Sequence, residues 1–90
     1  MAKNYRQIER MVRGFSNHRR VQILDILDKQ PELDLMEIAG LCGIQFRNAS
    51  EHLRRLAVAG LILKRPKGKR VLHALSPRGR AVLAFVRKLE

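Results

Sequence analysis

Apolar residues recur at steps of three and four along the first two-thirds of the chain, which is the spacing of one face of an α-helix. The first such stripe predicts a helix that ends near Gly14, and it consists of Tyr5, Ile8, Val12 and Phe15. A second helix is expected to begin at Ser16 or Asn17, either of which can cap it, and to end at Pro31. Its apolar positions are Val21, Ile23, Leu24 and Leu27.

Two further helices are predicted before residue 60. Asp34, with Glu37 three residues later, forms a capping box that starts the third helix, and Gly43 can take the left-handed conformation that stops it. Residues 33–35 fit either a small strand or an extended link. The inner side of the third helix is expected to be Ile38, Ala39, Leu41 and Cys42. A fourth helix covers about 46–59, and its inward residues are Ala49, Leu53 and Leu56.

After Gly60 the pattern changes to short apolar-rich runs at 61–65 and 70–75, separated by a Pro-Lys-Gly-Lys segment. Because proline presets a turn and glycine relaxes it, this part is expected to form a β-hairpin. Ser76 and Pro77 then provide an N-cap and a first helical residue. The stripe of this last helix is Ala81, Val82, Phe85, Val86 and Leu89. The sequence therefore predicts one mainly α domain over residues 1–90, with a small β-hairpin.

The charge of the chain is strongly one-sided. It has 90 residues, 19 of them basic and eight acidic, for a net charge of +11, and residues 52–89 contain no carboxylate. Such a surface repels itself and favours a partner that supplies negative charge, most commonly the phosphates of nucleic acid. An anionic membrane surface is the weaker alternative, since Trp is absent. No apolar run approaches the ~20 residues of a membrane span, and the start lacks the apolar core of a secretion signal, so the cytoplasm is the expected location.

The third and fourth helices carry the pattern of a helix-turn-helix between Met36 and Ala57. Ala39 must be small because the next helix crosses close to it, Gly43 makes the turn, and Ala49 faces inward. The residues that complete the joint are Ile38, Cys42 and Ile44. Two such helices followed at once by a basic hairpin form a much more specific pattern than the two helices alone.

With these motifs the chain resembles the winged helix-turn-helix transcription regulators, closest to the ArsR-like family. The segments that carry the resemblance are 20–24, 37–39, 50–56, 59–62 and 67–70, whereas 75–80 is more similar to the MarR-like branch. The resemblance implies a winged helix-turn-helix with additional helices at both ends. It also implies a homodimeric transcription regulator, expected to be a repressor, whose partner is double-stranded DNA.

The resemblance further implies that the outer face of the fourth helix lies in the major groove. Arg47 could contact a guanine edge, and Glu51 could accept from a cytosine or else pair with Arg54 or Arg55. The other interpretation of this face is an ordinary solvated helix surface. The DNA-binding residues expected here are Gln45, Phe46, Arg47, Asn48, Ser50, Glu51 and Arg54.

The hairpin is expected to contact phosphate or the minor groove, because a merely soluble turn does not need so many like charges. Its DNA-binding residues are expected to be Lys64, Arg65, Lys67, Lys69 and Arg70.

Neither a metal nor a cofactor is expected. The third helix has a lone Cys42, which is interpreted as a small core residue rather than a redox switch, and the last helix has no histidine. His52 is expected to be half-buried at the helix joint or else to contact phosphate, and His73 to be an ordinary strand residue. His18 is expected to be solvated or to lie near the backbone of DNA. The chain shows no Ser-His-Asp arrangement, phosphate loop or paired acids, so it is not expected to be an enzyme.

A domain of this size cannot bury both terminal stripes, so segments 1–15 and 77–90 are expected to form a dimer interface. Its residues are expected to be Tyr5, Ile8, Val12, Phe15, Val82, Phe85, Val86 and Leu89. The function predicted from the sequence is sequence-specific DNA binding by a homodimeric regulator. The alternatives are an architectural nucleic-acid-binding protein without sequence preference and a winged-helix adaptor that contacts another protein.

Overall fold

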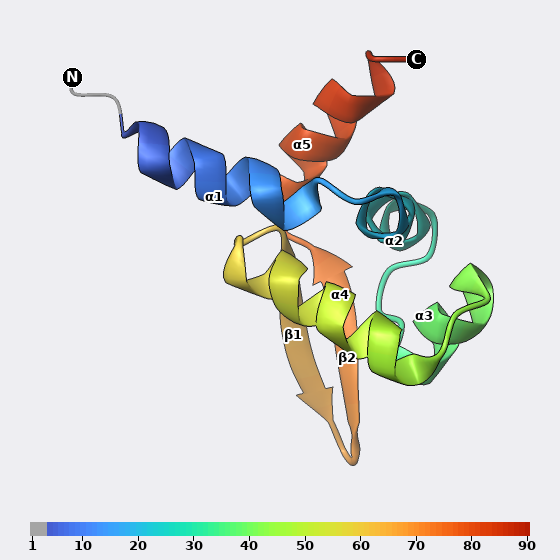
Figure 1. Ribbon diagram of the computed structural model, residues 1–90. Coiled ribbons are helices and arrows are strands. Elements are labelled where there is room, and N and C mark those ends of the chain that lie inside the picture. Colours follow the sequence, from blue (N-terminus) through green and yellow to red (C-terminus); the bar gives the residue numbers. More distant parts are fainter. Residues whose placement is uncertain (1–3) are drawn as a thin grey trace.

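The computed structural model describes residues 4–90 and shows the predicted order of elements (Figure 1). The elements are α1 (Tyr5–Phe15), α2 (His18–Lys29), α3 (Leu35–Cys42), α4 (Phe46–Val58), β1 (Ile62–Lys67), β2 (Arg70–Leu75) and α5 (Pro77–Arg87). The fold class is therefore confirmed. The hairpin points away from the end of the molecule where α1 and α5 lie (Figure 1). The first three residues of the predicted segment 1–15 fall outside the described part. No helix in residues 4–90 combines the length and apolarity of a membrane span.

The helices begin and end where the sequence provides caps. The Asn17 side chain accepts from the backbone N–H groups of Arg19 and Arg20, so Asn17 rather than Ser16 caps α2. Both bonds of the capping box at α3 are present, from the N–H of Glu37 to Asp34 (2.9 Å) and from the N–H of Asp34 to Glu37 (3.0 Å). These short-range signals fix the helix boundaries without help from the rest of the fold.

The core lies between α2, α3, α4 and the base of the hairpin. The largest fully buried side chains are Ile23, Leu24, Leu27, Ile38, Leu53, Leu56 and Leu61. The inward positions predicted for α4 are confirmed, but the prediction for Leu41 is wrong, since its side chain is 48% exposed. Leu41 lies about 100° around α3 from the face that Ile38, Ala39 and Cys42 bury. On α5 the buried residues include Leu83, whereas Ala81 is exposed.

The hairpin is longer than predicted because Pro66 belongs to strand β1. It pairs with Val71, and the last pair is Lys67 with Arg70, which leaves Gly68 and Lys69 as a two-residue turn. Gly68 has φ 63°, which a two-residue turn of this kind requires at its first position. In such a hairpin the closing pair is hydrogen-bonded, so the nitrogen of the preceding residue faces outward and a proline is tolerated there.

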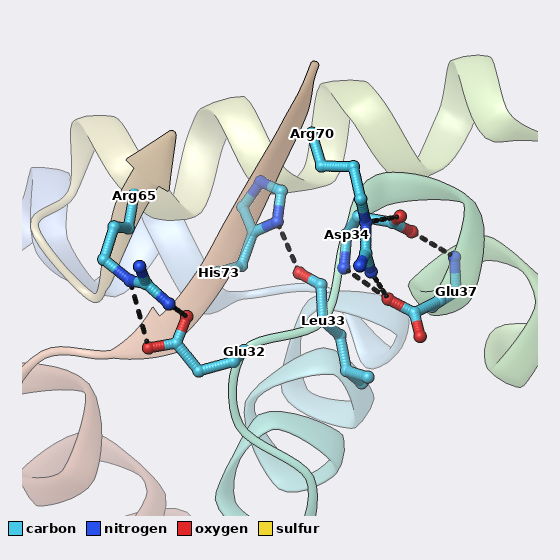
Figure 2. A network of polar contacts seen from close by, with 7 residues as sticks. All are labelled: Glu32, Leu33, Asp34, Glu37, Arg65, Arg70 and His73. Atoms are coloured by element: carbon cyan, nitrogen blue, oxygen red, sulfur yellow. Dashed lines mark hydrogen bonds and ion pairs between the residues drawn. The ribbon is translucent and has the colours of Figure 1, made fainter. Parts of the chain in front are cut away.

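The link between α2 and α3 forms a single β-bridge to the hairpin. Leu33 pairs with His73, and the N–H of Glu32 donates to the carbonyl of His73 (3.0 Å). The His73 side chain is only 4% exposed, and its Nδ1 donates to the Leu33 carbonyl over 2.9 Å (Figure 2). The prediction of an ordinary strand residue therefore missed that His73 holds the wing against the body of the protein.

A second contact fixes the base of the hairpin, where α4 ends and α5 begins. The N–H of Ser76 donates to the carbonyl of Leu61 (3.1 Å), and the Ser76 hydroxyl donates to the carbonyl of Gly60 (2.6 Å). Gly79 is packed so closely on this segment that an added Cβ would collide with the carbonyl oxygen of Leu61. The position of α5 therefore depends on a residue without a side chain at Gly79.

Replacing Gly79 by alanine is expected to lower the free energy of unfolding by about 1–3 kcal/mol, because the methyl group forces α5 away from Leu61. The matched control is Gly40→Ala in α3, where nothing lies within 4 Å of an added Cβ. That change is expected to stabilise the protein by about 0.5–1 kcal/mol, since alanine is the better helix former. Urea unfolding of both variants measures the difference, and equal effects would contradict the packing at Gly79.

The stability of the protein is expected to fall between pH 7.5 and 5.5. Burial lowers the pKa of His73 below its ordinary value of 6.5, so the unfolded chain takes up a proton at a higher pH than the folded one. His73 therefore contributes stability above about pH 6.5 that is lost as the pH falls towards the folded pKa, with a slope of at most about 1.4 kcal/mol per pH unit. Urea titrations at several pH values should show a shallower dependence in His73→Gln. His52, whose pKa burial also lowers, is present in both proteins and cancels.

Candidate nucleic-acid interface

The joint between α3 and α4 sets which face of α4 is available. Gly43 takes the left-handed conformation at φ 67°, and the N–H of Ile44 donates to the carbonyl of Ala39 (3.1 Å). Ala39 and Ala49 are both buried where the two helices pack together, as predicted for small residues at a close crossing. Since Ala49, Leu53 and Leu56 occupy the inner face of α4, the opposite face points to solvent.

All the residues predicted to contact DNA from α4 are exposed. They are Gln45, Phe46, Arg47, Asn48, Ser50, Glu51 and Arg54. Phe46 is a large apolar side chain left 58% exposed at the start of the helix. Among the described residues Arg47 forms no ion pair, so its guanidinium keeps all its donors for a partner.

Glu51 binds the two arginines that follow it on α4. Arg54 donates from Nε (2.9 Å) and Nη2 (2.6 Å) to its two oxygens, and Arg55 donates from Nε over 3.1 Å. The hydrogen bonds from Arg54 lower the pKa of Glu51 to about 2, so the carboxylate is charged at neutral pH. Of the two interpretations of Glu51, the pairing with Arg54 and Arg55 is present in the structure, and contact with a base stays a prediction.

The five basic residues of the wing are all exposed, but they fall into two groups. Arg65 pairs with Glu32 (3.2 Å), and Arg70 pairs with Asp34 (2.8 Å) and Glu37 (2.6 Å) (Figure 2). The second group forms no ion pair within residues 4–90, and it consists of Lys64, Lys67 and Lys69.

These ion pairs tie the hairpin to the segment that starts α3. The hydrogen bond from the backbone N–H of Glu37 lowers the pKa of Asp34 most, and Arg70 lowers this pKa further, so Asp34 stays charged. The carboxylates of Glu32, Asp34 and Glu37 contact the wing, which the sequence did not indicate. Their partners lie more than thirty residues away in the sequence, so no local pattern could indicate the contact.

A cleft of about 520 Å³ lies between α3, α4 and the wing. Ser50 of the α4 stripe and Lys64, Lys69 and Arg70 of the wing line it together, above an apolar wall that includes Leu53. Ser50 of the outer face of α4 therefore lies on the same concave surface as three basic residues of the hairpin.

The terminal helices leave most of their apolar stripes exposed, at the end of the molecule away from the hairpin tip (Figure 1). The exposed residues of the predicted dimer interface are Tyr5, Ile8, Val12, Phe85 and Leu89. Phe15 and Val86 are partly buried against the core. Val82 is only 8% exposed and packs inside the chain, so it differs from the rest of the predicted interface.

The remaining candidates for reactive or metal-binding groups are a cysteine and two histidines. Cys42 is buried, and burial raises the pKa of its thiol, which disfavours the reactive thiolate. His52 is partly buried and His18 is exposed, as predicted. Within residues 4–90 no group of three His, Cys, Asp or Glu side chains is placed to hold a metal ion.

Solved structures with the same architecture identify the fold family, although no protein-family model matches the chain. A possible transcriptional regulatory protein from Mycobacterium bovis (fragment 1–100) is 30% identical, covering 94% of this chain and 91% of its own, with a TM-score of 0.84. The homodimeric winged helix-turn-helix DNA-binding domain of Mb0332 from Mycobacterium bovis, a possible ArsR-family regulator, is 29% identical over 99% and 89%, with a TM-score of 0.84. HlyU from Vibrio cholerae is 28% identical over 99% and 97%, with a TM-score of 0.83.

These similarities extend over nearly the whole chain and include the wing as well as both terminal helices. They agree with the left-handed turn at Gly43, the outward face of α4 and the basic hairpin beside it. The chain belongs to the winged helix-turn-helix transcription regulators and is ArsR-like.

Proposed function

We propose that the protein is a cytoplasmic, homodimeric transcription regulator that binds specific DNA sequences and represses by occupying promoter DNA. The observation that carries this proposal is the common surface of α4 and the wing. Ser50 of the outward α4 stripe borders one cleft with Lys64 and Lys69 of the hairpin, which form no ion pair within residues 4–90, on a chain with a net charge of +11. A duplex can engage both only when they lie on one side.

Base recognition is assigned to the first half of α4. Arg47 has no ion pair among the described residues, and a guanidinium is well suited to the two acceptors of a guanine edge. Ser50 lies one turn further along the same face and borders the cleft towards the wing. Asn48 and Gln45 flank this face with amide groups that can bond to adenine or phosphate.

In the wing, the two groups of basic residues are assigned different roles. Lys64, Lys67 and Lys69 are the phosphate contacts, since the described residues leave their ammonium groups unpaired. Arg65 and Arg70 hold the hairpin at a fixed angle to α3 through their carboxylate partners. This assignment narrows the predicted set of five wing contacts to three direct contacts and two positioning residues.

A dimer interface would bury the apolar side chains of α1 and α5 that stay exposed within residues 4–90 of a single chain. The similar domain of Mb0332 is described as homodimeric. A two-fold dimer would present two α4 helices to successive major grooves, about 34 Å apart, and would select a near-palindromic site.

Sequence preference separates this function from a nonspecific DNA-coating protein. Selection of bound sequences from a random DNA library should enrich one motif with two related halves. Equal affinities for the selected and random duplexes across a salt series would instead support a coating protein. The absence of any duplex binding would favour an adaptor that contacts another protein.

Arg47→Ala is expected to weaken binding to the selected site by about 1–3 kcal/mol and to relax its sequence preference, because a bidentate base contact is lost. Lys67→Ala is expected to weaken selected and random duplexes by the same factor, since phosphates are common to both. Fluorescence anisotropy with the two duplexes measures both effects. If each variant loses the same factor on both duplexes, α4 does not read the sequence.

Ile8→Glu is expected to shift the protein from dimer to monomer, because it places a charge in the apolar stripe of α1. Leu41→Glu is the matched control, since Leu41 is exposed to a similar degree on α3, outside the terminal helices. Light scattering gives the mass of each variant. A dimer that survives in Ile8→Glu, or that is lost in both variants, would contradict the assigned interface.

A further inference from the structure

A second concave surface lies between α1 and the C-terminal half of α4. It encloses about 410 Å³, and its lining includes Arg10 and Arg13 of α1 with Arg54 and Arg55 of α4. Two helices thus bring four guanidinium groups around one cleft. Neither the recognition face of α4 nor the wing accounts for the two arginines of α1.

The position of the cleft is fixed by a close helix contact. Gly14 is buried where α1 meets the end of α4, and an added Cβ there would collide with the Cβ of Ala59. On α1, Arg10 lies one turn before Gly14 and Arg13 lies next to it, and both line the cleft beside α4. The cleft is therefore built on two packed helices rather than on loops.

The local charge is not balanced within the described residues. Arg13 pairs with Glu9 (3.2 Å), and Glu51 is shared between Arg54 (2.6 Å) and Arg55 (3.1 Å), so two carboxylates face four guanidinium groups. Arg10 has no ion pair in residues 4–90. Close to Arg55 lies Arg20, whose buried Nε and Nη1 have no hydrogen-bond partner among the described residues. An anion in the cleft would compensate this excess of positive charge.

The cleft continues the DNA-facing surface of α4. Arg54 belongs both to the outward stripe that begins at Arg47 and to the lining of the cleft. A helix of 13 residues is about 20 Å long, whereas the major groove is about 12 Å wide. If α4 enters the groove with its first half and at an angle to it, its second half passes over the phosphates at the groove edge.

We propose that the cleft between α1 and α4 binds backbone phosphates of the strand that borders the recognised major groove, as a contact separate from the wing. The inference rests on the proposed function, because it takes the ligand to be the same duplex. Arg10 and Arg13 supply the contacts from α1, and Arg54 exchanges Glu51 for phosphate. Soluble polyphosphates share this chemistry, so the experiment must separate them from DNA.

The test compares Arg10→Gln with Arg6→Gln. Both changes remove one exposed positive charge from α1 and keep a good helix former, but Arg6 does not line the cleft. Binding to the selected duplex is measured between 50 and 200 mM salt, with light scattering to show that both variants remain dimers. Arg10→Gln should reduce the steepness of log K against log salt by about 0.9. Between the two salt concentrations its affinity should therefore fall by roughly 3.5-fold less than that of the wild-type protein. Arg6→Gln should leave the slope unchanged.

Ethylation interference locates the lost contact on the DNA. Arg10→Gln should lose interference at phosphates different from those lost in Lys67→Ala. Calorimetry with inorganic tripolyphosphate, without DNA, provides the second arm. Tripolyphosphate binding that disappears in Arg10→Gln, together with an unchanged salt slope on DNA, would assign the cleft to a soluble anion and overturn the proposal.

The remaining outcomes separate the two proposals. If the wild-type protein binds the duplex and Arg47→Ala weakens it, but Arg10→Gln behaves like Arg6→Gln, the cleft proposal alone is overturned. If the wild-type protein binds no duplex, both the proposed function and the cleft proposal fail. A reduced slope in Arg10→Gln with its own set of lost phosphates supports both.

Discussion

The angle between α4 and the wing depends on one crowded junction at Leu61. The backbone of Leu61 accepts from Ser76, and the same carbonyl lies against Gly79, so the end of α4, both strands of the hairpin and the start of α5 meet at one residue. Interiors packed this closely transmit displacements instead of absorbing them. A shift of α5 at Gly79 would therefore move the hairpin relative to α4. Since α5 carries part of the exposed apolar stripe, the same junction couples the proposed dimer surface to the proposed DNA-facing surface.

The ion pairs of the wing act on geometry more than on stability. Arg65, Arg70 and their carboxylate partners are exposed or half-exposed, and such pairs contribute little to the stability of the fold. Their effect is on orientation, because Arg70 is bound to the carboxylates of Asp34 and Glu37 at the start of α3, which limits how far the hairpin can swing. The buried bond from His73 to Leu33 gives the same restraint from the other face of the strand. The wing is therefore held before any partner arrives, which reduces the entropy lost on binding.

The sequence predicted every element whose signal is local. Asn17, Asp34 with Glu37, Gly43 and Ser76 with Pro77 each define a helix end within four residues, and the structure confirms them. Apart from Leu41, which lies at the edge of the buried face of α3, predictions failed where a contact spans the chain. Pro66 looked like a turn residue, but strand pairing with Val71 decides its place. The burial of His73 depends on a bridge to Leu33, forty residues away in the sequence, and the division of the wing cations depends on carboxylates equally remote. The candidate DNA-facing residues were predictable because helical periodicity alone places them outward.

Long-range charge and short-range geometry have separate consequences in this protein. A net charge of +11 attracts any duplex, and the exposed ion pairs neutralise it only locally, so it speeds encounter without choosing a sequence. Discrimination between DNA sequences requires side chains whose hydrogen bonding differs between bases, and the exposed face of α4 offers several candidates, Arg47 and Glu51 among them. Among residues 4–90 Arg47 forms no ion pair, whereas Glu51 is kept ionised by Arg54 and Arg55. The negative charge of Glu51 opposes phosphate binding at this face of α4, so it moderates the attraction of a +11 chain for any duplex, whatever the sequence.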